Sequence, residues 1–299
     1  MNRGYTYVAQ LGPEAAGRVL ASFLAARWPH STRETWEERI AAGAVLLDGA
    51  TAQAASSLRP GQTLTWSRPP WVEPEAPTSF AVLHRDPDLL AVAKPAGLPT
   101  LPGAGFLEHT LLSLVQAHDP QAVPVHRLGR FTSGLVLFAR TPSLRTHLSR
   151  GWSNVEKRYR ALATGSPAKD TFLVDAPIGP VPHPRLGTVH GASSTGRASR
   201  SEATVLERRD GAFLCDVRIG TGRPHQIRIH LAAAGHPLVG DPLYAEGGVP
   251  MADRPGVPGD GGYLLHAAEL RFLHPRTGEL LSLLCAPPAP LRIRTGTVS

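Results

Sequence analysis

The side chains of this chain that could do chemistry are histidines, arginines and aromatics gathered in two blocks. Residues 126–135 read HRLGRFTSGL, and residues 221–231 read TGRPHQIRIHL. His225, His230 and the nearby His236 invite a metal site, but no cysteine or carboxylate cluster accompanies them. If 221–231 forms a strand, His225 and His230 point to opposite faces, because side chains alternate along a strand. We therefore expect no metal, and the cations of these blocks indicate recognition of an anion.

Other catalytic patterns are incomplete. Thr132-Ser133-Gly134 lacks the first glycine and the spacing of the nucleophile elbow of serine hydrolases. Gly103-Ala104-Gly105 is followed by Phe106 where a phosphate-binding loop needs a lysine. The zinc base deaminases require a P-C-x-x-C element, which is absent. These three chemistries are therefore excluded.

The charge of the chain favours a polyanionic partner. The formal net charge is +7 and the pI is about 10.0. Residues 121–160 hold eight Lys or Arg residues and one acid, Glu156. Such a block predicts a phosphate-facing surface. The alternative is a solvated basic face that reflects composition, since almost all of the cations are arginine.

Composition also bounds the compartment. No apolar run reaches the length of about 18 residues that a membrane helix needs, and the first residues have no apolar secretory core. Two cysteines, Cys215 and Cys285, are too few for a disulfide framework or a four-thiolate zinc site. We expect no membrane association and a reducing, cytoplasmic location.

The elements that must position these side chains fall into two predicted domains. Residues 1–68 form a small α+β domain, 69–78 a proline-rich linker, and 79–299 a large sheet domain. In the small domain, Ser31 and Glu34 have the spacing of a capping box at a helix start. A strand at 45–47 and an Asp-Gly turn then follow.

In the large domain, residues 80–93 predict a β-hairpin, and Thr110 is placed to cap a helix. A strand at 135–139 leads into a helix at 140–152. The Gly- and Pro-rich stretches 179–197 and 246–262 predict surface loops. Short strands without regular βαβ alternation predict an α+β fold with a mixed, largely antiparallel sheet.

The motifs of the large domain occur in the order found in one enzyme family. They are Lys94-Pro95-Ala96-Gly97-Leu98, the HRLGRFTSGL block, Lys157-Arg158-Tyr159, the TGRPHQIRIHL block, Gly240-Asp241-Pro242-Leu243-Tyr244, Leu265-His266-Ala267 and His274-Pro275. This pattern resembles the RluA-type RNA pseudouridine synthases over roughly residues 80–290. The small domain resembles the RNA-binding domain first seen in ribosomal protein S-four, which many members of that family carry.

The resemblance implies a pseudouridine synthase fold with a central RNA-binding cleft, and isomerisation of uridine in ribosomal or transfer RNA. The uridine must leave the stack to be reached. By the same resemblance Tyr159 stacks on the flipped base, Arg228 pairs with an aspartate nucleophile, and Arg127 enters the RNA where the base left. The other RNA-binding residues that it implies are Arg130, His126, Lys157, Arg223 and Lys94.

The chain departs from the family pattern at the nucleophile. Gly129 stands where the family keeps its aspartate, and Phe131 stands where a second carboxylate is common. Glycine has no side chain that could attack, and Arg228 is then expected to lack its partner and to seek an anion. Three other acids, Asp119, Asp175 and Asp241, are expected to be structural rather than surrogate nucleophiles.

Two hypotheses follow from this departure. The first is a pseudouridine synthase with a non-standard active site. The second is a catalytically silent relative that binds RNA in ribosome assembly or RNA folding. Under both hypotheses the partner is RNA and no small-molecule cofactor is needed. The resemblance also implies that the protein is a monomer.

Overall fold

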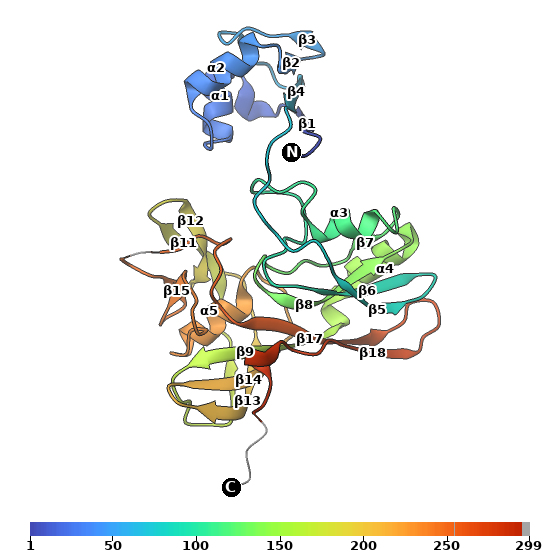
Figure 1. Ribbon diagram of the computed structural model, residues 1–299. Helices are drawn as coiled ribbons and strands as arrows, with labels where there is room; N and C mark the ends of the chain where they lie inside the picture. The colour runs from blue at the N-terminus through green and yellow to red at the C-terminus, as the bar shows by residue number, and fades with distance from the viewer. Residues whose placement is uncertain (254, 295–299) are drawn as a thin grey trace. The chain divides into compact units, whose positions relative to one another are not determined.

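A computed structural model describes residues 1–253 and 255–294 of the chain (Figure 1). The chain divides into two compact units, Met1–Glu73 (unit 1) and Pro74–Ser299 (unit 2). The division falls inside the predicted linker, 69–78. Trp71 and Glu73 both bond to the Asn2 side chain, so this part of the stretch is tied into unit 1. Residues 254 and 295–299 of the predicted large domain lie outside the described residues.

Unit 1 is a four-stranded antiparallel sheet with two α-helices. Its elements are β1 (Tyr5–Gln10), η1 (Pro13–Ala15), α1 (Leu20–Arg27), α2 (Arg33–Ala41), β2 (Val45–Leu47), β3 (Ala50–Thr51) and β4 (Thr63–Arg68). The strand order is β1-β4-β2-β3. The predicted turn between β2 and β3 is present, with both Asp48 and Gly49 at positive φ as a two-residue hairpin turn requires.

The core of unit 1 forms where the two helices meet the sheet. Trp36 and Ile40 of α2 are both buried, as expected for residues four apart on one helix face. The predicted cap is wrong by one residue. Thr32, not Ser31, accepts the bond from the Thr35 amide, while Ser31 accepts from Arg39.

Unit 2 is built on a ten-stranded sheet in the order β10-β13-β14-β9-β17-β8-β6-β5, with β18 beside β17 and β7 beside β8. These strands are β5 (Ala81–Arg85), β6 (Leu89–Lys94), β7 (Val123–Pro124), β8 (Ser133–Ala139), β9 (Glu156–Thr164), β10 (Thr171–Val174), β13 (Ser201–Arg209), β14 (Ala212–Ile219), β17 (Leu265–Leu273) and β18 (Leu280–Leu284). The remaining elements are α3 (Leu111–Gln116), α4 (Pro142–Gly151), η2 (Trp152–Asn154), β11 (Ile178–His183), β12 (Gly187–Ala192), α5 (Gln226–Ala233), β15 (Tyr244–Ala245), β16 (Val249–Pro250) and η3 (Ala289–Leu291).

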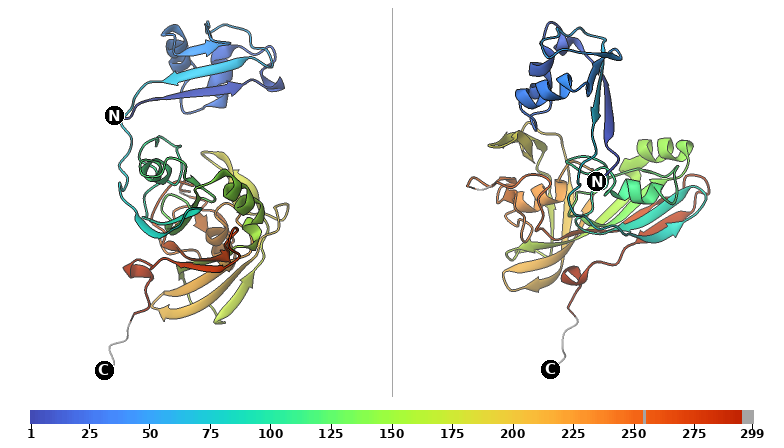
Figure 2. Two further views of the ribbon diagram at one scale, coloured as in Figure 1. Left: turned by 90° about the vertical axis from the view of Figure 1, so that its right-hand side faces the viewer. Right: turned by 45° about the horizontal axis from the view of Figure 1, so that its top comes forward.

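The sheet of unit 2 has two halves, joined by β17. Strands β9, β14, β13 and β10 lie on one side of β17 and β8, β6 and β5 on the other. Figure 2 shows α3 and α4 with the half that holds β5 and β6, and α5 with the half that holds β13 and β14. Each half has its own buried cluster, and the Tyr159 ring packs against both.

The pair β8–β17 is the one parallel pairing in the described sheet, and it needs a glycine. A Cβ on Gly134 would lie 2.3 Å from the Ala267 carbonyl oxygen, and Gly134 has φ of +109°. Only glycine allows the two backbones to approach so closely. Gly134 of the HRLGRFTSGL block therefore allows β8 to pair with β17, the strand that joins the two halves of the sheet.

Several predicted elements are confirmed and others are wrong. The β5–β6 hairpin, the Thr110 cap on α3 and the β8–α4 succession are present. The stretch 179–197 was expected to be a loop, but β11 and β12 pair along it because Val181 and Val189 find a buried site. Within 246–262, Val249–Pro250 forms the short strand β16.

From Gln226 onward the block at 221–231 forms the helix α5 (Gln226–Ala233) rather than the expected strand. Its apolar residues alternate like those of a strand, yet residues 226–232 are all buried, so no polar face reveals the helical period. Gln226, at the first turn, accepts from the Thr221 hydroxyl and the Arg223 amide and donates to the Arg200 carbonyl. These bonds fix the start of the helix.

The fold class is confirmed as α+β with a mixed, largely antiparallel sheet. Across residues 1–253 and 255–294, no helix combines the length and the apolar character that crossing a membrane would require.

Candidate active site

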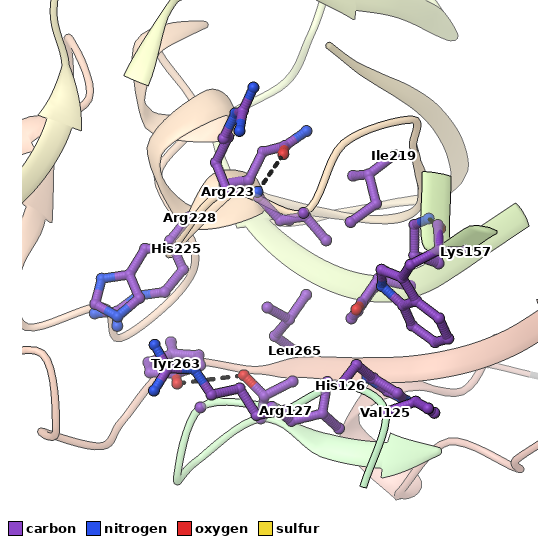
Figure 3. A pocket seen from close by; sticks show the side chains of 18 residues that line it. Val125, His126, Arg127, Lys157, Ile219, Arg223, His225, Arg228, Tyr263 and Leu265 are labelled. Carbon is purple, nitrogen blue, oxygen red and sulfur yellow. Dashed lines mark hydrogen bonds between the residues drawn. The ribbon is translucent and has the colours of Figure 1, made fainter. Parts of the chain in front are cut away.

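A pocket of about 340 Å³ opens in unit 2 between the two halves of its sheet. That volume suits a site for one small organic group. Figure 3 shows Lys157 and Ile219 on one side of the pocket, and His225 and Tyr263 on the other. The lining residues are Val125, His126, Arg127, Leu128, Gly129, Thr132, Trp152, Lys157, Tyr159, Ile219, Gly222, Arg223, His225, Gln226, Ile227, Arg228, Tyr263 and Leu265.

The loop that carries Gly129 is fixed by its backbone. Thr100 bonds both the amide and the carbonyl of Leu128. The Lys94 ammonium donates to the carbonyl oxygens of Pro95, Leu98 and Arg130. Lys94 is 1% exposed, so the expectation that it contacts RNA is wrong. It supports the loop from within, because a buried ammonium needs acceptors for its donors.

His126 and Lys157 line the pocket, but their polar atoms face inward. His126 Nε2 accepts from the Leu137 amide at 3.0 Å, and its ring stacks on Trp152. Burial, with a smaller effect of the Lys157 charge, lowers the pKa of His126 to about 3. Lys157 donates to the carbonyls of Trp152 and Val155 and is 3% exposed. Lys157 supports the wall of the pocket from within, so the expected contact with RNA is wrong for this residue. The His126 ring is partly exposed at the pocket, and its contact with RNA stays a prediction.

The arginines in and near the pocket differ in how many hydrogen bonds their guanidinium groups make within the protein. Arg127 is exposed and makes no hydrogen bond or ion pair with any described residue. Arg223 is held only by long bonds of 3.4 and 3.3 Å to the Ala198 carbonyl. Arg130 does not line the pocket. It donates to the carbonyls of Gly97 and Glu75 and covers the Phe106 ring. Arg127 is therefore the cation at the pocket best able to take an outside phosphate.

Tyr159 lies in the middle of β9, opposite Val217 of β14 and Ala267 of β17. Burial raises the pKa of the Tyr159 phenol to about 12, so the ring stays neutral at physiological pH. Its hydroxyl makes no hydrogen bond with a described residue. The side chain therefore offers the pocket an aromatic face rather than a charged group.

Arg228 has a partner, contrary to the expectation from sequence. Its Nε and Nη2 atoms donate to the two carboxylate oxygens of Asp241, each at 2.7 Å. The two side chains are 2% and 1% exposed. Burial lowers the pKa of Arg228, but the bonds and charge of Asp241 outweigh this and raise it. Asp241 thus supplies the counter-charge that the resemblance assigned to an aspartate at position 129.

One donor of Arg228 remains without a partner. Nη1 is buried and has no hydrogen bond among the described residues. The guanidinium also covers the Tyr263 ring at 4.2 Å from its centroid. The Asp241 carboxylate has two further hydrogen bonds, because the backbone amides of Leu243 and Tyr244 donate to its Oδ1 atom. Asp241 therefore serves a structural role, as expected, although its pairing with Arg228 was not foreseen.

Tyr263 is the pocket residue that the sequence analysis missed. Its hydroxyl lies 3.3 Å from the Thr132 hydroxyl (dashed in Figure 3). A Cβ on Gly129 would lie 3.0 Å from the same phenol oxygen. No motif marks Tyr263, since it sits beyond a glycine-rich loop and two residues before Leu265.

The three histidines considered as metal ligands each have protein partners. His225 bonds Tyr244, His230 bonds Ser201 and Ser199, and His236 bonds the Thr164 carbonyl. His225 precedes α5 and His230 lies within it, so the expectation that the two side chains point to opposite faces of a strand was wrong.

Among residues 1–253 and 255–294, the group that has metal-ligand geometry is formed by Asp86, Asp88 and His274, and it includes none of these three histidines. Asp86 already bonds His84, and Asp88 pairs with Arg276.

The fold agrees with that of pseudouridylate synthases. Human RNA Pseudouridylate Synthase Domain Containing 1 superposes with a TM-score of 0.55 at 24% identity, covering 73% of this chain and 87% of that one. Human RNA Pseudouridylate Synthase Domain Containing 4 gives a TM-score of 0.56 at 22% identity, covering 71% and 90%. The chain thus has the fold of the pseudouridylate synthases, with a pocket between the two halves of its sheet.

Sequence comparison gives the family. The model of the RNA pseudouridylate synthase family matches residues 88–233. An uncharacterized RNA pseudouridine synthase of Synechocystis is 44% identical over 91% of this chain and 95% of its own length. RNA pseudouridine synthase 5 of Oryza sativa is 36% identical, covering 98% and 89%. Ribosomal large subunit pseudouridine synthase D of Xanthomonas campestris is 35% identical, covering 93% and 88%. The chain belongs to the RNA pseudouridine synthase family.

Proposed function

We propose that the chain isomerises uridine to pseudouridine in ribosomal or transfer RNA, in the cytoplasm, through an active site that lacks the carboxylate nucleophile. The observation that carries the proposal is that Tyr159, Arg228 and Gly129 line one pocket. Had Tyr159 and Arg228 lain on opposite sides of the molecule, no base could contact both. A binder without catalysis has little need of a pocket for a single flipped base.

The substrate enters the pocket as an extruded nucleotide. Unstacking a base costs a few kcal/mol, which protein contacts must offset. Stacking on the Tyr159 ring supplies about 1–3 kcal/mol of this. Arg127, exposed and unpaired among the described residues, takes the place in the RNA that the base vacates, or a phosphate beside it. Arg223 is the second cation at the rim.

Unit 1 is proposed to add RNA affinity, as an RNA-binding domain of the ribosomal protein S-four kind. Arg68 covers the partly exposed Trp71 ring, and such a pair suits contact with nucleic acid. Arg39 lies over the buried rings of Trp36 and Trp66 and adds a partly exposed cation. The reaction has no redox or energy requirement, so no small-molecule cofactor is needed, and the chain is proposed to act as a monomer.

A second candidate function is RNA binding without catalysis, in ribosome assembly or RNA folding. The absence of a carboxylate at both Gly129 and Phe131 favours it. The loop is then more cationic and more apolar than the family pattern, which suits holding RNA.

The deciding experiment incubates purified full-length protein with ribosomal and transfer RNA that lacks pseudouridine, and maps new pseudouridine by carbodiimide labelling. New pseudouridine at one or a few positions supports the synthase. No pseudouridine from the natural chain, with activity gained by Gly129→Asp, supports the binding-only relative. A chain that neither modifies RNA nor binds it contradicts both functions.

A further inference from the structure

Tyr263 lies beside the place that a side chain at position 129 would occupy. An ideal Cβ on Gly129 would lie 3.0 Å from the Tyr263 phenol oxygen and 3.5 Å from the Thr132 hydroxyl oxygen. A separation of 3.0 Å is tighter than nine in ten real Cβ contacts, so the phenol would have to shift by a few tenths of an ångström to admit a Cβ. The phenol oxygen therefore borders the position where the side chain of residue 129 would begin.

The second departure from the family pattern is tied to the first. A Cβ on Gly261 would lie 2.5 Å from the Phe131 ring. The loops 129–132 and 259–263 thus interlock through two reciprocal contacts, in which a glycine of each loop accommodates an aromatic ring of the other. Gly129 and Phe131, which stand in place of the two acids, therefore both contact the 259–263 loop. These contacts position Tyr263 at the pocket.

The loop that carries Tyr263 is also fixed to the Arg228 anchor. Gly262 and Gly240 meet backbone to backbone, since a Cβ on Gly262 would lie 2.5 Å from the Gly240 carbonyl oxygen. Gly240 directly precedes Asp241, which holds Arg228. Tyr263 and the Arg228 guanidinium are therefore set in place by the same turn.

The electrostatics around Tyr263 suit an attacking oxygen. Arg228 lies 4.2 Å from the ring centroid, and its Nη1 has no partner among the described residues. A fixed cation beside the phenol stabilises negative charge that develops on the oxygen. Of the other nearby phenols, Tyr159 offers its ring face, and Tyr244 is fully buried, donates to the His190 carbonyl and does not line the pocket.

We propose that the Tyr263 hydroxyl replaces the missing carboxylate as the nucleophile of the isomerisation, an inference that rests on the proposed function. The phenol oxygen forms a bond to C1′ of the ribose as the C1′–N1 bond breaks, and that electron pair leaves with uracil. The phenol proton passes to N1 of the released base. Tyrosine serves as the nucleophile in some glycoside hydrolases, so the chemistry is accessible to this side chain.

The second half of the reaction restores the enzyme. After the base rotates, its C5 atom uses the C5–C6 π electrons to form the C5–C1′ bond, and the oxygen–C1′ bond pair returns to Tyr263. The proton from C5 then goes to the phenolate. The product carries hydrogen on N1 and carbon on C1′, and no oxidant, reductant or cofactor is consumed. Two displacements also retain the configuration at C1′.

The test is Tyr263→Phe, which removes one oxygen and keeps the ring against Arg228 and Gly129. Pseudouridine formation in single turnover is expected to fall by about 10³-fold or more, as when an attacking group is removed, while RNA affinity stays within about threefold. Tyr244→Phe is the matched control, because it also removes a phenol oxygen beside Arg228. It is expected to keep the rate within about tenfold of the natural chain.

The single-turnover rates of the natural chain and of Tyr263→Phe together distinguish a failure of the proposed function from a failure of the role of Tyr263. If the natural chain forms no pseudouridine, the proposed function fails and this inference fails with it. If the natural chain is active and Tyr263→Phe keeps a rate within about threefold, only the role of Tyr263 is overturned.

A second variant decides the matter if Tyr263→Phe fails to fold. A 3-fluorotyrosine at position 263 keeps the shape and makes the phenol more acidic. A single-turnover rate that changes by about threefold or more supports the inference, because the rate of an attacking oxygen depends on its acidity. An unchanged rate overturns it.

Discussion

Breaking the buried pair between Arg228 and Asp241 should be costly for both stability and activity. Asp241→Asn keeps the shape of the side chain, and its amide oxygen can still accept from the Leu243 and Tyr244 amides. Its amide nitrogen, however, faces a guanidinium donor of Arg228. The variant thus loses at least one charge-assisted bond of 2.7 Å and leaves a cation that is 2% exposed without its counter-charge.

The magnitude follows from burial. Removing one partner of a buried ion pair costs about 3–5 kcal/mol, because the remaining charge cannot regain water. The total stability of a domain is about 5–15 kcal/mol, so the variant should lose about a fifth or more of it. An exposed pair gives the matched control. Arg218 and Glu202 are 59% and 35% exposed, and Glu202→Gln should cost less than about 1 kcal/mol.

The assay must report on unit 2. Four of the five tryptophans lie in unit 1, so intrinsic fluorescence would follow the wrong unit. Hydrogen exchange of peptides covering 226–245, measured over a urea series, reports on α5 and the Asp241 turn directly. A loss of less than about 1 kcal/mol for Asp241→Asn would refute the reasoning, because it would mean that water or another acceptor reaches Arg228.

A double variant then separates stability from chemistry. Arg228→Met with Asp241→Leu removes both charges and should recover part of the stability, since apolar pairs often replace buried ion pairs well. Two backbone donors lose their acceptor, so the recovery is incomplete. Pseudouridine formation should stay lost, and an active double variant would contradict the role of the cation.

Three further predictions concern the pocket. Arg127→Ala should weaken RNA binding and reduce the slope of log affinity against log salt by about 0.7–0.9, because one phosphate contact is lost; an unchanged slope in a salt titration would contradict this. Tyr159→Phe should retain most single-turnover activity and Tyr159→Ala should lose it, since stacking uses the ring and the hydroxyl has no bonded partner among the described residues; equal rates for both variants would argue against stacking. The pKa of His126 is lowered to about 3, so the unfolded chain binds more protons than the folded chain between about pH 3 and 6.5, and stability falls as pH falls through that window. His126→Gln, which keeps an acceptor for the Leu137 amide but cannot be protonated, should flatten this loss by up to about 1.4 kcal/mol per pH unit, and parallel stability curves for the two proteins would contradict it.

Local signals in the sequence determined the elements that depend on near neighbours. The hairpin of β5 and β6, the Asp48-Gly49 turn and the Thr110 cap were all predicted, because turn and cap chemistry acts within a few residues. The motif pattern also predicted the family and the α+β class. It brought Tyr159, Arg228 and Arg127 into one site, and the structure places all three at one pocket.

Burial decided what the sequence misjudged. The alternation of apolar residues in 221–231 predicts a strand, but a segment buried on nearly every side carries no polar face from which its period could be read. Lys94 was expected at the RNA, yet three carbonyl acceptors hold it inside. Whether a charged side chain faces water or the core depends on acceptors that other segments supply.

Contacts between distant segments decided the chemistry of the pocket. Arg228 and Asp241 pair across the end of α5, and Tyr263 meets Gly129 from a loop far along the chain. From the sequence, the resemblance predicted that an attacking carboxylate is missing at position 129. Only the folded chain showed which side chain lies beside that position, because a glycine in a sequence does not identify its neighbour in space.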